Sequence, residues 1–179
     1  MITPVLQSER ILLKPVSMDH CSDFYVSWMN DPEVNLYLES GGDYSLDLLK
    51  NYLHEALMKK DVLFWAIHLR SSGKHIGNVK IDPIYPRHYR GELGILLGDK
   101  TEWGKGYGRE ATSLTIRYFF DQLKYNKLTL GVIEGNEAAI RLYASLGFNL
   151  EGTFRQHGYY GEKMCDLYRM AIFNPDFKQ

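Results

Sequence analysis

The amino-acid sequence predicts a mixed α/β (α+β) fold, in which a central, mostly antiparallel sheet of about seven strands carries helices on both faces. Three observations lead to this prediction. Apolar residues alternate with a period of two through the middle of the chain, as in adjacent strands. Segments of helical periodicity lie on both sides of that region. The last part of the chain alternates strand and helix before two closing strands.

The N-terminal part is expected to form one strand and two helices. ERILLKP (residues 9–15) is the strand. Ser17 is expected to cap a helix that ends at the Asn, Asp and Pro of residues 30–32, and Ser45 to cap a second helix. The apolar stripes are Cys21, Phe24, Tyr25 and Trp28 in the first helix and Leu46, Leu49, Leu53 and Leu57 in the second.

The middle of the chain predicts an antiparallel meander. VLFWAIHL (62–69) and HIGNVKID (75–82) are joined by the turn SSGK, and ELGILL (92–97) follows after a loop that contains proline. Strands this close in sequence pair with their neighbours.

The C-terminal part begins with the glycine-rich stretch WGKGYG (103–108). A helix is expected at Arg109–Lys124, then the strand KLTLGVI (127–133). Asn136 should cap a further helix that Gly147 ends. FNLEGTF (148–154) and KMCDLYRMAI (163–172) are the closing strands.

Composition and charge limit the classes of protein. The chain has 179 residues, of which 45% are hydrophobic, and we expect one domain over residues 1–179. The formal net charge of -1 argues against nucleic acid or an anionic membrane as a partner. Two cysteines without a CxxC pair, and apolar runs too short to cross a bilayer, predict a cytoplasmic protein with reduced thiols.

The spacing of the three glycines distinguishes between kinds of phosphate-binding loop. A Walker loop needs Lys and Ser or Thr after its last glycine, whereas Arg109 follows Gly108. A dinucleotide fingerprint needs GxGxxG in an early βαβ unit, which the meander excludes. What remains is a turn whose N–H groups converge on an anion at a helix start, or a flexible solvated turn. Lys100, Lys105 and Arg109 add positive charge there, and Glu102 opposes it.

Three stretches resemble a known family. WGKGYGREA, NEAAIRLYASLGF (136–148) and WMNDPEVNLYL (28–38) are similar to the acetyl-CoA-dependent N-acetyltransferases of the GNAT superfamily. The branch is the one that contains ribosomal-protein, N-terminal-alanine, antibiotic and sugar-nucleotide N-acetyltransferases. The resemblance covers nearly the whole chain and implies the GNAT fold. One departure is Trp103, where the superfamily usually has Gln or Arg, so this side chain is not expected to contact phosphate.

The resemblance implies where acetyl-CoA, the cosubstrate, should bind. The main chain of the glycine loop should hold the pyrophosphate, and the end of the third meander strand should pair with the pantetheine amides. Asn136 should both cap its helix and contact the pantetheine arm. The implied cosubstrate-binding residues are Ile95, Leu96, Leu97, Trp103, Gly104, Lys105, Gly106, Tyr107, Gly108, Arg109 and Asn136.

Two catalytic residues are expected, because the amine must lose a proton and the thiolate must gain one. Tyr143 is the expected donor, at the place of the family's general-acid tyrosine; the alternative is a core tyrosine whose hydroxyl bonds to the backbone. Glu92 is the expected base, acting directly or through a water; the alternative is a strand-end carboxylate paired with Arg87 or Arg90. The spacing of the six histidines predicts no metal site.

The amine acceptor is less defined. Arg87, His88 and Arg90, interleaved with tyrosines, fit a phosphorylated or nucleotide-linked amino sugar, and a solvated tyrosine-rich loop explains them equally well. The acidic residues of the other wall favour a cationic peptide N-terminus; they are Asp31, Glu33, Glu39 and Asp43. A non-catalytic acyl-CoA sensor is the alternative of another class. The aromatic tip HGYYGE (157–162) would suit a homodimer contact.

Overall fold

The computed structural model describes residues 1–39 and 42–178, which build one eight-stranded sheet in the order β1-β2-β3-β4-β5-β6-β8-β7. Neighbouring strands are antiparallel except β5 and β6, which are parallel. The mixed, mostly antiparallel sheet is therefore confirmed. The strands are β1 (Leu6–Gln7), β2 (Ile11–Pro15), β3 (Leu63–Leu69), β4 (His75–Tyr85), β5 (Arg90–Leu97), β6 (Lys127–Ile133), β7 (Asn149–Tyr160) and β8 (Lys163–Phe173).

One strand more than expected is present. Leu6–Gln7 pairs with β2 at the edge of the sheet, and these two residues are too few to show a periodicity in sequence. The strand β7 is also longer than expected, because residues 155–160 continue it up to a turn at residues 161–162, whereas β8 begins at Lys163 as expected.

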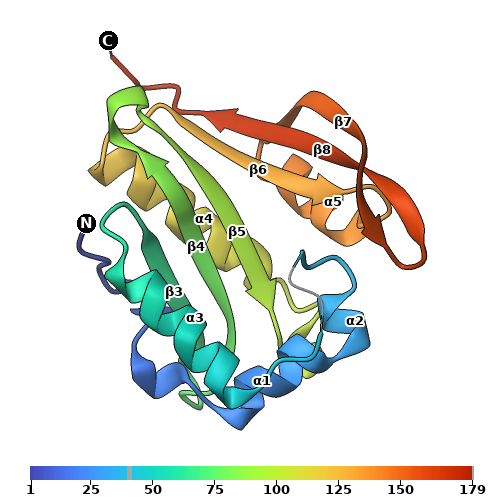
Figure 1. Cartoon of the computed structure of the whole chain (residues 1–179). Coiled ribbons are helices and arrows are strands. Elements are labelled where there is room, and N and C mark those ends of the chain that lie inside the picture. Colours follow the sequence, from blue (N-terminus) through green and yellow to red (C-terminus); the bar gives the residue numbers. More distant parts are fainter. Residues whose placement is uncertain (40–41, 179) are drawn as a thin grey trace.

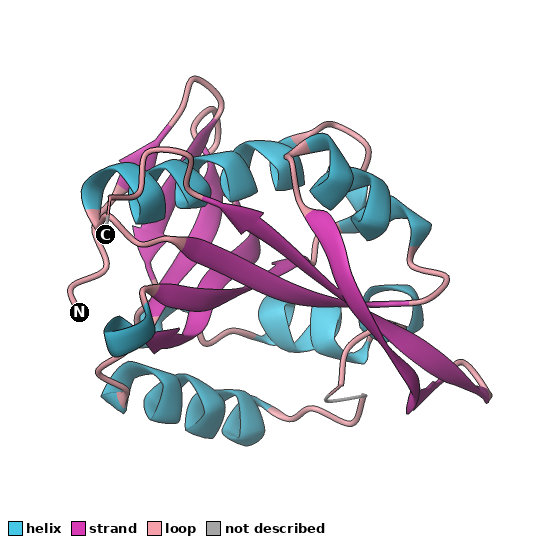
Figure 2. Cartoon of the chain, turned by 90° about the horizontal axis from the view of Figure 1, so that it is seen from above, coloured by secondary structure: helices cyan, strands magenta, loops and turns pink. Residues whose placement is uncertain are grey.

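Helices cover both faces of the sheet, as Figure 2 shows. On one face lie α1 (Asp23–Asn30), α2 (Pro32–Asn35) and α3 (Leu46–Met58); on the other lie α4 (Tyr107–Arg117) and α5 (Glu137–Ser145). Each layer has its own core. The larger core, under α4 and α5, includes Trp65 and Phe119, and the smaller core, under α1 and α3, includes Trp28 and Leu49. In the described part of the chain, none of the helices is long and apolar enough to cross a membrane.

The expected cap of the first helix is wrong. Ser17 begins only one 3₁₀ turn, Met18–His20, in which the His20 imidazole accepts the Ser17 N–H at 3.0 Å. The backbone is extended again at Cys21, and the Ser22 side chain then caps α1 by accepting the N–H of Tyr25. Two capping residues five positions apart thus divide one expected helix into a turn and a helix. The expected end at Asn30 and the cap at Ser45 are confirmed.

The helix after the glycines also differs from its expected bounds. It begins at Tyr107, two residues early, because Gly106 at φ 84° takes the cap position in the left-handed region. It continues as one π turn over Tyr118–Gln122, and Lys124 at φ 59° ends the helical region. Two glycines of the loop therefore precede the helix, and Gly108 lies in its first turn.

The parallel pair β5 and β6 separates along its length. The strands pair only where residues 90–92 lie beside residues 127–129, and Figure 1 shows them diverging beyond that point. Residues 93–97 of β5 therefore keep β4 on one side and have no strand of this sheet on the other. Glu92 is the last paired residue, so it lies where the gap begins.

Candidate active site

The strand β5 presents main-chain hydrogen-bonding groups to the gap beside it. In an antiparallel ladder, successive residues turn their N–H and C=O groups alternately to the two sides. The N–H of Gly98 donates to the carbonyl of Ile76 at 3.0 Å, so Leu96, two residues earlier, also turns toward β4. Ile95 and Leu97 therefore turn their main-chain groups toward the gap. Of the three residues expected to pair with pantetheine, these two have the right orientation.

Trp103 connects the end of β5 to the glycine loop. Its indole N–H donates to the carbonyl of Leu97 at 2.7 Å, and its ring is partly exposed. This bond uses the Leu97 carbonyl, which leaves its N–H for a ligand. The indole N–H is therefore occupied by the strand, and Trp103 acts on the loop by positioning it.

The glycine loop has the backbone conformation of an anion-binding turn. Gly104 and Gly106 have φ of 74° and 84°, values that other residues rarely adopt. Arg10 donates to the carbonyl of Lys105 at 3.0 Å and to Glu110 at 2.8 Å, which holds the loop from outside. The first N–H groups of a helix have no intrahelical acceptor, so those of residues 107–109 point out of the start of α4. These donors and the positive end of α4 fit a pyrophosphate.

The positive charge around this loop is smaller than the sequence suggests. Lys105 donates to Glu102 at 2.9 Å, and Lys100 donates to Glu33 at 2.7 Å and reaches Asp31 at 2.8 Å. These carboxylates raise the pKa of both ammonium groups, and they neutralise their charge. Among the three expected cations, the exposed Arg109 at the helix start is the one for which no ion pair is formed within the described residues.

The loop, the open strand and α5 meet at Gly108. A Cβ on Gly108 would lie 3.9 Å from Cδ1 of Ile95 and 3.8 Å from Cδ2 of Leu142. Asn136 begins α5 by accepting the N–H of Ala139 with its side chain at 3.2 Å, so the expected capping role is confirmed. The next residue after Leu142 is Tyr143, the expected proton donor.

Tyr143 is buried with its hydroxyl protonated. Only 6% of the residue is exposed, and its ring packs against Phe148 with centroids 5.7 Å apart. Burial raises the pKa of the hydroxyl to about 12, and no charge or hydrogen bond from the described residues contributes to that shift. A neutral phenol of this kind can donate a proton and does not compete as a base at neutral pH.

Glu92 forms a bidentate ion pair with Arg169, which the sequence did not predict. Arg169 of β8 donates to its two carboxylate oxygens at 2.8 and 2.9 Å. Arg87 or Arg90 was the partner in the alternative to a catalytic base. Glu92 is indeed paired, but with Arg169, and the guanidinium of Arg90 lies instead 3.9 Å from the ring centre of Tyr85. Glu92 raises the pKa of Arg169, and the pair is partly exposed, with side-chain exposures of 33% and 24%.

A pocket of about 450 Å³ lies between β5 and the helices α1 and α3. Its described walls are mostly aromatic and aliphatic, with Asn78, Lys80 and Glu39 as the polar exceptions beside three tyrosines. Ile95 and Leu96 form part of it, so it borders the strand that faces the gap. The pocket therefore borders β5 on the face that α1 and α3 cover.

The loop of residues 85–90 lies away from this pocket. It precedes β5, and Arg90 lies four residue steps, roughly 13 Å, before Gly94, the first residue of β5 that lines the pocket. Tyr89 packs instead near Tyr125 and Phe177. The loop therefore gives no support for a nucleotide-linked acceptor in the pocket beside Leu96.

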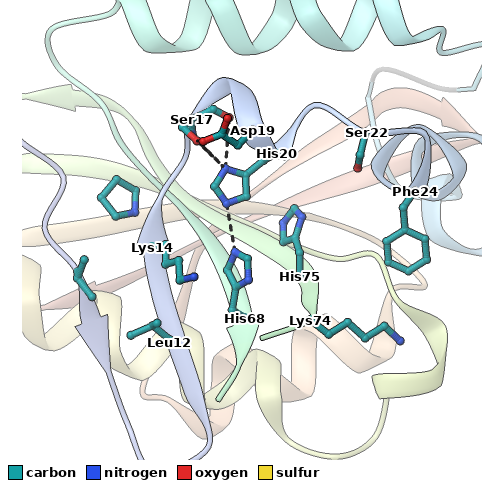
Figure 3. A pocket seen from close by; sticks show the side chains of 12 residues that line it. Leu12, Lys14, Ser17, Asp19, His20, Ser22, Phe24, His68, Lys74 and His75 are labelled. Carbon is teal, nitrogen blue, oxygen red and sulfur yellow. Dashed lines mark hydrogen bonds between the residues drawn. The ribbon is translucent and has the colours of Figure 1, made fainter. Parts of the chain in front are cut away.

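Sequence spacing missed a cluster of three histidines, drawn in Figure 3. His20 and His68 face each other with Nε2 atoms 3.1 Å apart, and the ring of His75 stacks on that of His68. His68 Nδ1 lies 2.9 Å from the carbonyl of Gly73 and must carry a proton, so its Nε2 accepts from His20. Within the described residues, no three His, Cys, Asp or Glu side chains are arranged to hold a metal ion.

The comparisons with known proteins agree with this geometry. The profile of the acetyltransferase (GNAT) domain matches residues 10–149. The chain belongs to the GNAT acetyltransferases. It is an N-acetyltransferase that uses acetyl-CoA, and the fold and cosubstrate implied by the sequence are confirmed.

Individual relatives cover most of this GNAT chain. It is 24% identical to the uncharacterized N-acetyltransferase YoaA of Bacillus subtilis, over 96% of this chain and 98% of the relative. It is 29% identical to the spermidine N(1)-acetyltransferase of Escherichia coli, over 73% and 67%. Among solved structures, the spermidine N-acetyltransferase of Vibrio cholerae in complex with CoA and spermine matches with a TM-score of 0.86 at 21% identity, covering 95% of this chain and 99% of that one.

Proposed function

We propose that this enzyme transfers the acetyl group directly from acetyl-CoA to a primary amine of a small molecule bound in the pocket beside Ile95 and Leu96. The observation that carries the proposal is the meeting of three elements at Gly108. There the glycine loop, the open edge of β5 and the helix of Tyr143 lie within side-chain contact of one another.

The residues present fit acetyl-CoA. In the proposal, the main chain of residues 104–109 holds the pyrophosphate, because its N–H groups have no acceptor within the described residues and Gly104 and Gly106 permit the turn. Arg109 supplies the charge. The main-chain groups of Ile95 and the N–H of Leu97 pair with the pantetheine amides as an added strand would. Asn136 lies at the start of α5, where a contact with the pantetheine arm is compatible with its capping bond.

Tyr143 is proposed to protonate the departing thiolate. The buried phenol has a pKa of about 12, so it keeps its proton at neutral pH and can donate a hydrogen bond, and then the proton, to sulfur as charge develops there. The step breaks the C–S bond and forms the C–N bond, and the tyrosine regains its proton from solvent after CoA leaves.

Glu92 is proposed to accept the proton of the ammonium ion through water. It lies on the strand that borders the acceptor pocket, about 10 Å along the strand from Ile95, too far for direct contact with an amine at the thioester. Arg169 occupies one direction at each carboxylate oxygen, and the remaining lone pairs can accept from water.

The acceptor is proposed to be a small molecule, with an amino sugar and a polyamine as the two classes to be compared. The relatives named as spermidine N-acetyltransferases favour a polyamine. The mostly apolar pocket, with one lysine on its wall, favours an amine of low charge. A protein N-terminus remains the third class.

The assay that tests the proposal follows free CoA with a thiol reagent in the presence of amino sugars, polyamines and short peptides. Acetylated product by mass spectrometry must match the CoA released. Acetyl-CoA binding in the micromolar range without turnover on any amine would favour a sensor and contradict the proposal.

A further inference from the structure

A buried amide in the wall of the acceptor pocket has an unused hydrogen-bond donor. Asn78 is 3% exposed, and its Nδ2 has no hydrogen-bond partner within the described part of the chain. Buried polar groups are nearly always paired, and an unpaired donor lowers the stability of a fold. Such a group in a binding pocket is a candidate for a ligand contact.

The hydrogen bonds of His75 fix which end of the amide is the donor. His75 Nε2 lies 2.9 Å from the carbonyl of Gly77, so this nitrogen must carry a proton. The same nitrogen lies 3.1 Å from Asn78, and only an oxygen there can accept that proton. The oxygen of the amide therefore faces His75, and Nδ2 is on the other side of the planar group.

Asn78 itself lines the acceptor pocket, and less than 1 Å² of its Nδ2 is accessible. His75 lines the hollow of Figure 3, and Asn78 lines the pocket beside Leu96, so the two residues separate the two cavities. Asn78 lies directly opposite Leu96 in the ladder of β4 and β5. An acceptor atom of a ligand in the pocket is therefore the group that Nδ2 can pair with.

The charged groups of the pocket are one of each sign. Of its described lining residues, Glu39 and Lys80 carry charge. The ammonium of Lys80 lies 3.5 Å from the hydroxyl of Tyr52 and 3.7 Å from the carboxylate of Asp82, so it already has partners. Glu39 can pair with the ammonium group of an amine. A polyamine offers only donors and so leaves Nδ2 unpaired, whereas an amine that also has an oxygen can pair with both Glu39 and Nδ2.

We infer that the substrate of this enzyme is an amine with a hydroxyl or carbonyl oxygen, and that Asn78 selects it by donating a hydrogen bond to that oxygen. The inference rests on the proposed function for the position of the pocket. It makes Asn78 a specificity residue, with no part in the proton transfers.

Matched pairs of amines test the inference. Phenylalaninamide against phenethylamine adds a carbonyl oxygen, glucosamine against cyclohexylamine adds hydroxyls, and spermidine is the oxygen-free polyamine. Calorimetry with protein saturated with CoA measures binding without turnover. The oxygen-bearing member of at least one pair should bind about tenfold more tightly than its partner, since a lost bond at a buried donor has about that effect. A preference in the first pair would indicate that the substrate oxygen is a carbonyl, and a preference in the second pair that it is a hydroxyl.

Two variants separate recognition from folding. Asn78→Asp keeps the oxygen that accepts from His75 and removes the donor, and Asn78→Leu removes both. In each variant, the affinities for the two amines of the selected pair should become nearly equal. The change should appear as a higher KM for the oxygen-bearing amine, with kcat for the oxygen-free amine retained. Acetyl-CoA binding should be unchanged. An unchanged preference in a folded Asn78→Asp protein, or tighter binding of spermidine than of every oxygen-bearing amine, would overturn the inference. CoA release without acetylated amine would instead contradict the proposed function.

Discussion

Arg169 on β8 holds both carboxylate oxygens of Glu92 on β5, at 2.8 and 2.9 Å, and so ties the two sides of the gap together where it begins. The pair joins strands that β6 separates. Its two parallel bonds fix the orientation of the carboxylate more tightly than a single bond would. A carboxylate held this way can direct a water toward the amine without moving itself.

Glu92→Gln should therefore lower kcat by about 10- to 100-fold. General base catalysis raises the rate by a factor on the order of 10²–10⁴, and a water molecule that accepts the proton without Glu92 would recover part of this factor. KM for acetyl-CoA should change little. Glu151→Gln is the control, since Glu151 is a carboxylate of the edge strand β7 that pairs with Lys127. The measurement is kcat of both variants and the parent enzyme from pH 6 to 9. An unchanged kcat in Glu92→Gln would mean that bulk solvent, and not Glu92, accepts the proton of the amine.

Tyr143→Phe should lower kcat by at least tenfold and leave the binding of acetyl-CoA intact. The hydroxyl supplies the proton for the thiolate, whereas the ring continues to pack against Phe148. Tyr125→Phe makes the same change at a tyrosine that is equally buried in the same core and distant from β5's open edge. If both variants retain full turnover, Tyr143 is a packing residue and the thiolate is protonated by water.

Gly106→Ala should weaken acetyl-CoA binding about tenfold, because a side chain at φ 84° strains the turn that aims the N–H groups. Gly73→Ala introduces a similar strain at φ 72° in the β3–β4 turn, with no atom within 4 Å of the new Cβ. Both variants should lose about 1 kcal/mol of stability. Calorimetry should show weaker binding for Gly106→Ala alone, and equal affinities would remove the loop from the site.

The sequence predicted the features of this site that are local in the chain. The spacing of Gly104, Gly106 and Gly108 and the capping pattern at Asn136 each depend on a few neighbouring residues. The pair of Glu92 and Arg169 depends on strands 77 positions apart, whose register no local pattern contains.

The sequence predicts the hairpin that carries two of the three histidines but not their register. A hairpin symmetric about the turn SSGK would place His68 opposite Gly77, whereas the register shifts between Ile67 and His68 and places His68 opposite His75. His20 could not be placed in the same way, because its position depends on the turn at Met18–His20 and not on a helix. The direction of the Asn78 amide follows from that cluster, so it too needed the structure.

Acid should destabilise the fold through the histidine cluster. Burial lowers the pKa of His75 to about 4, and it also lowers the pKa values of His20 and His68. An unfolded histidine has a pKa of about 6.5, so between pH 6.5 and pH 4 the unfolded chain binds protons that the folded protein excludes. The contribution of His75 is fully present above pH 6.5 and falls as the pH drops through that window. At pH 5.0 the loss from His75 alone is about 2 kcal/mol.

Urea unfolding at pH 7.5 and 5.0 measures this loss, with His75→Gln as the test variant and His54→Gln, an exposed position on α3, as the control. Gln can still donate a hydrogen bond to the carbonyl of Gly77 and does not titrate, so the variant should lose less stability between the two pH values than the parent protein. The neighbouring charges of Lys14, Lys74 and Asp19 are present in all three proteins and cancel in the comparison. Equal losses in His75→Gln and His54→Gln would show that the acid sensitivity comes from other groups, because of these two histidines His75 is the one whose ring packs against His68 and Trp28.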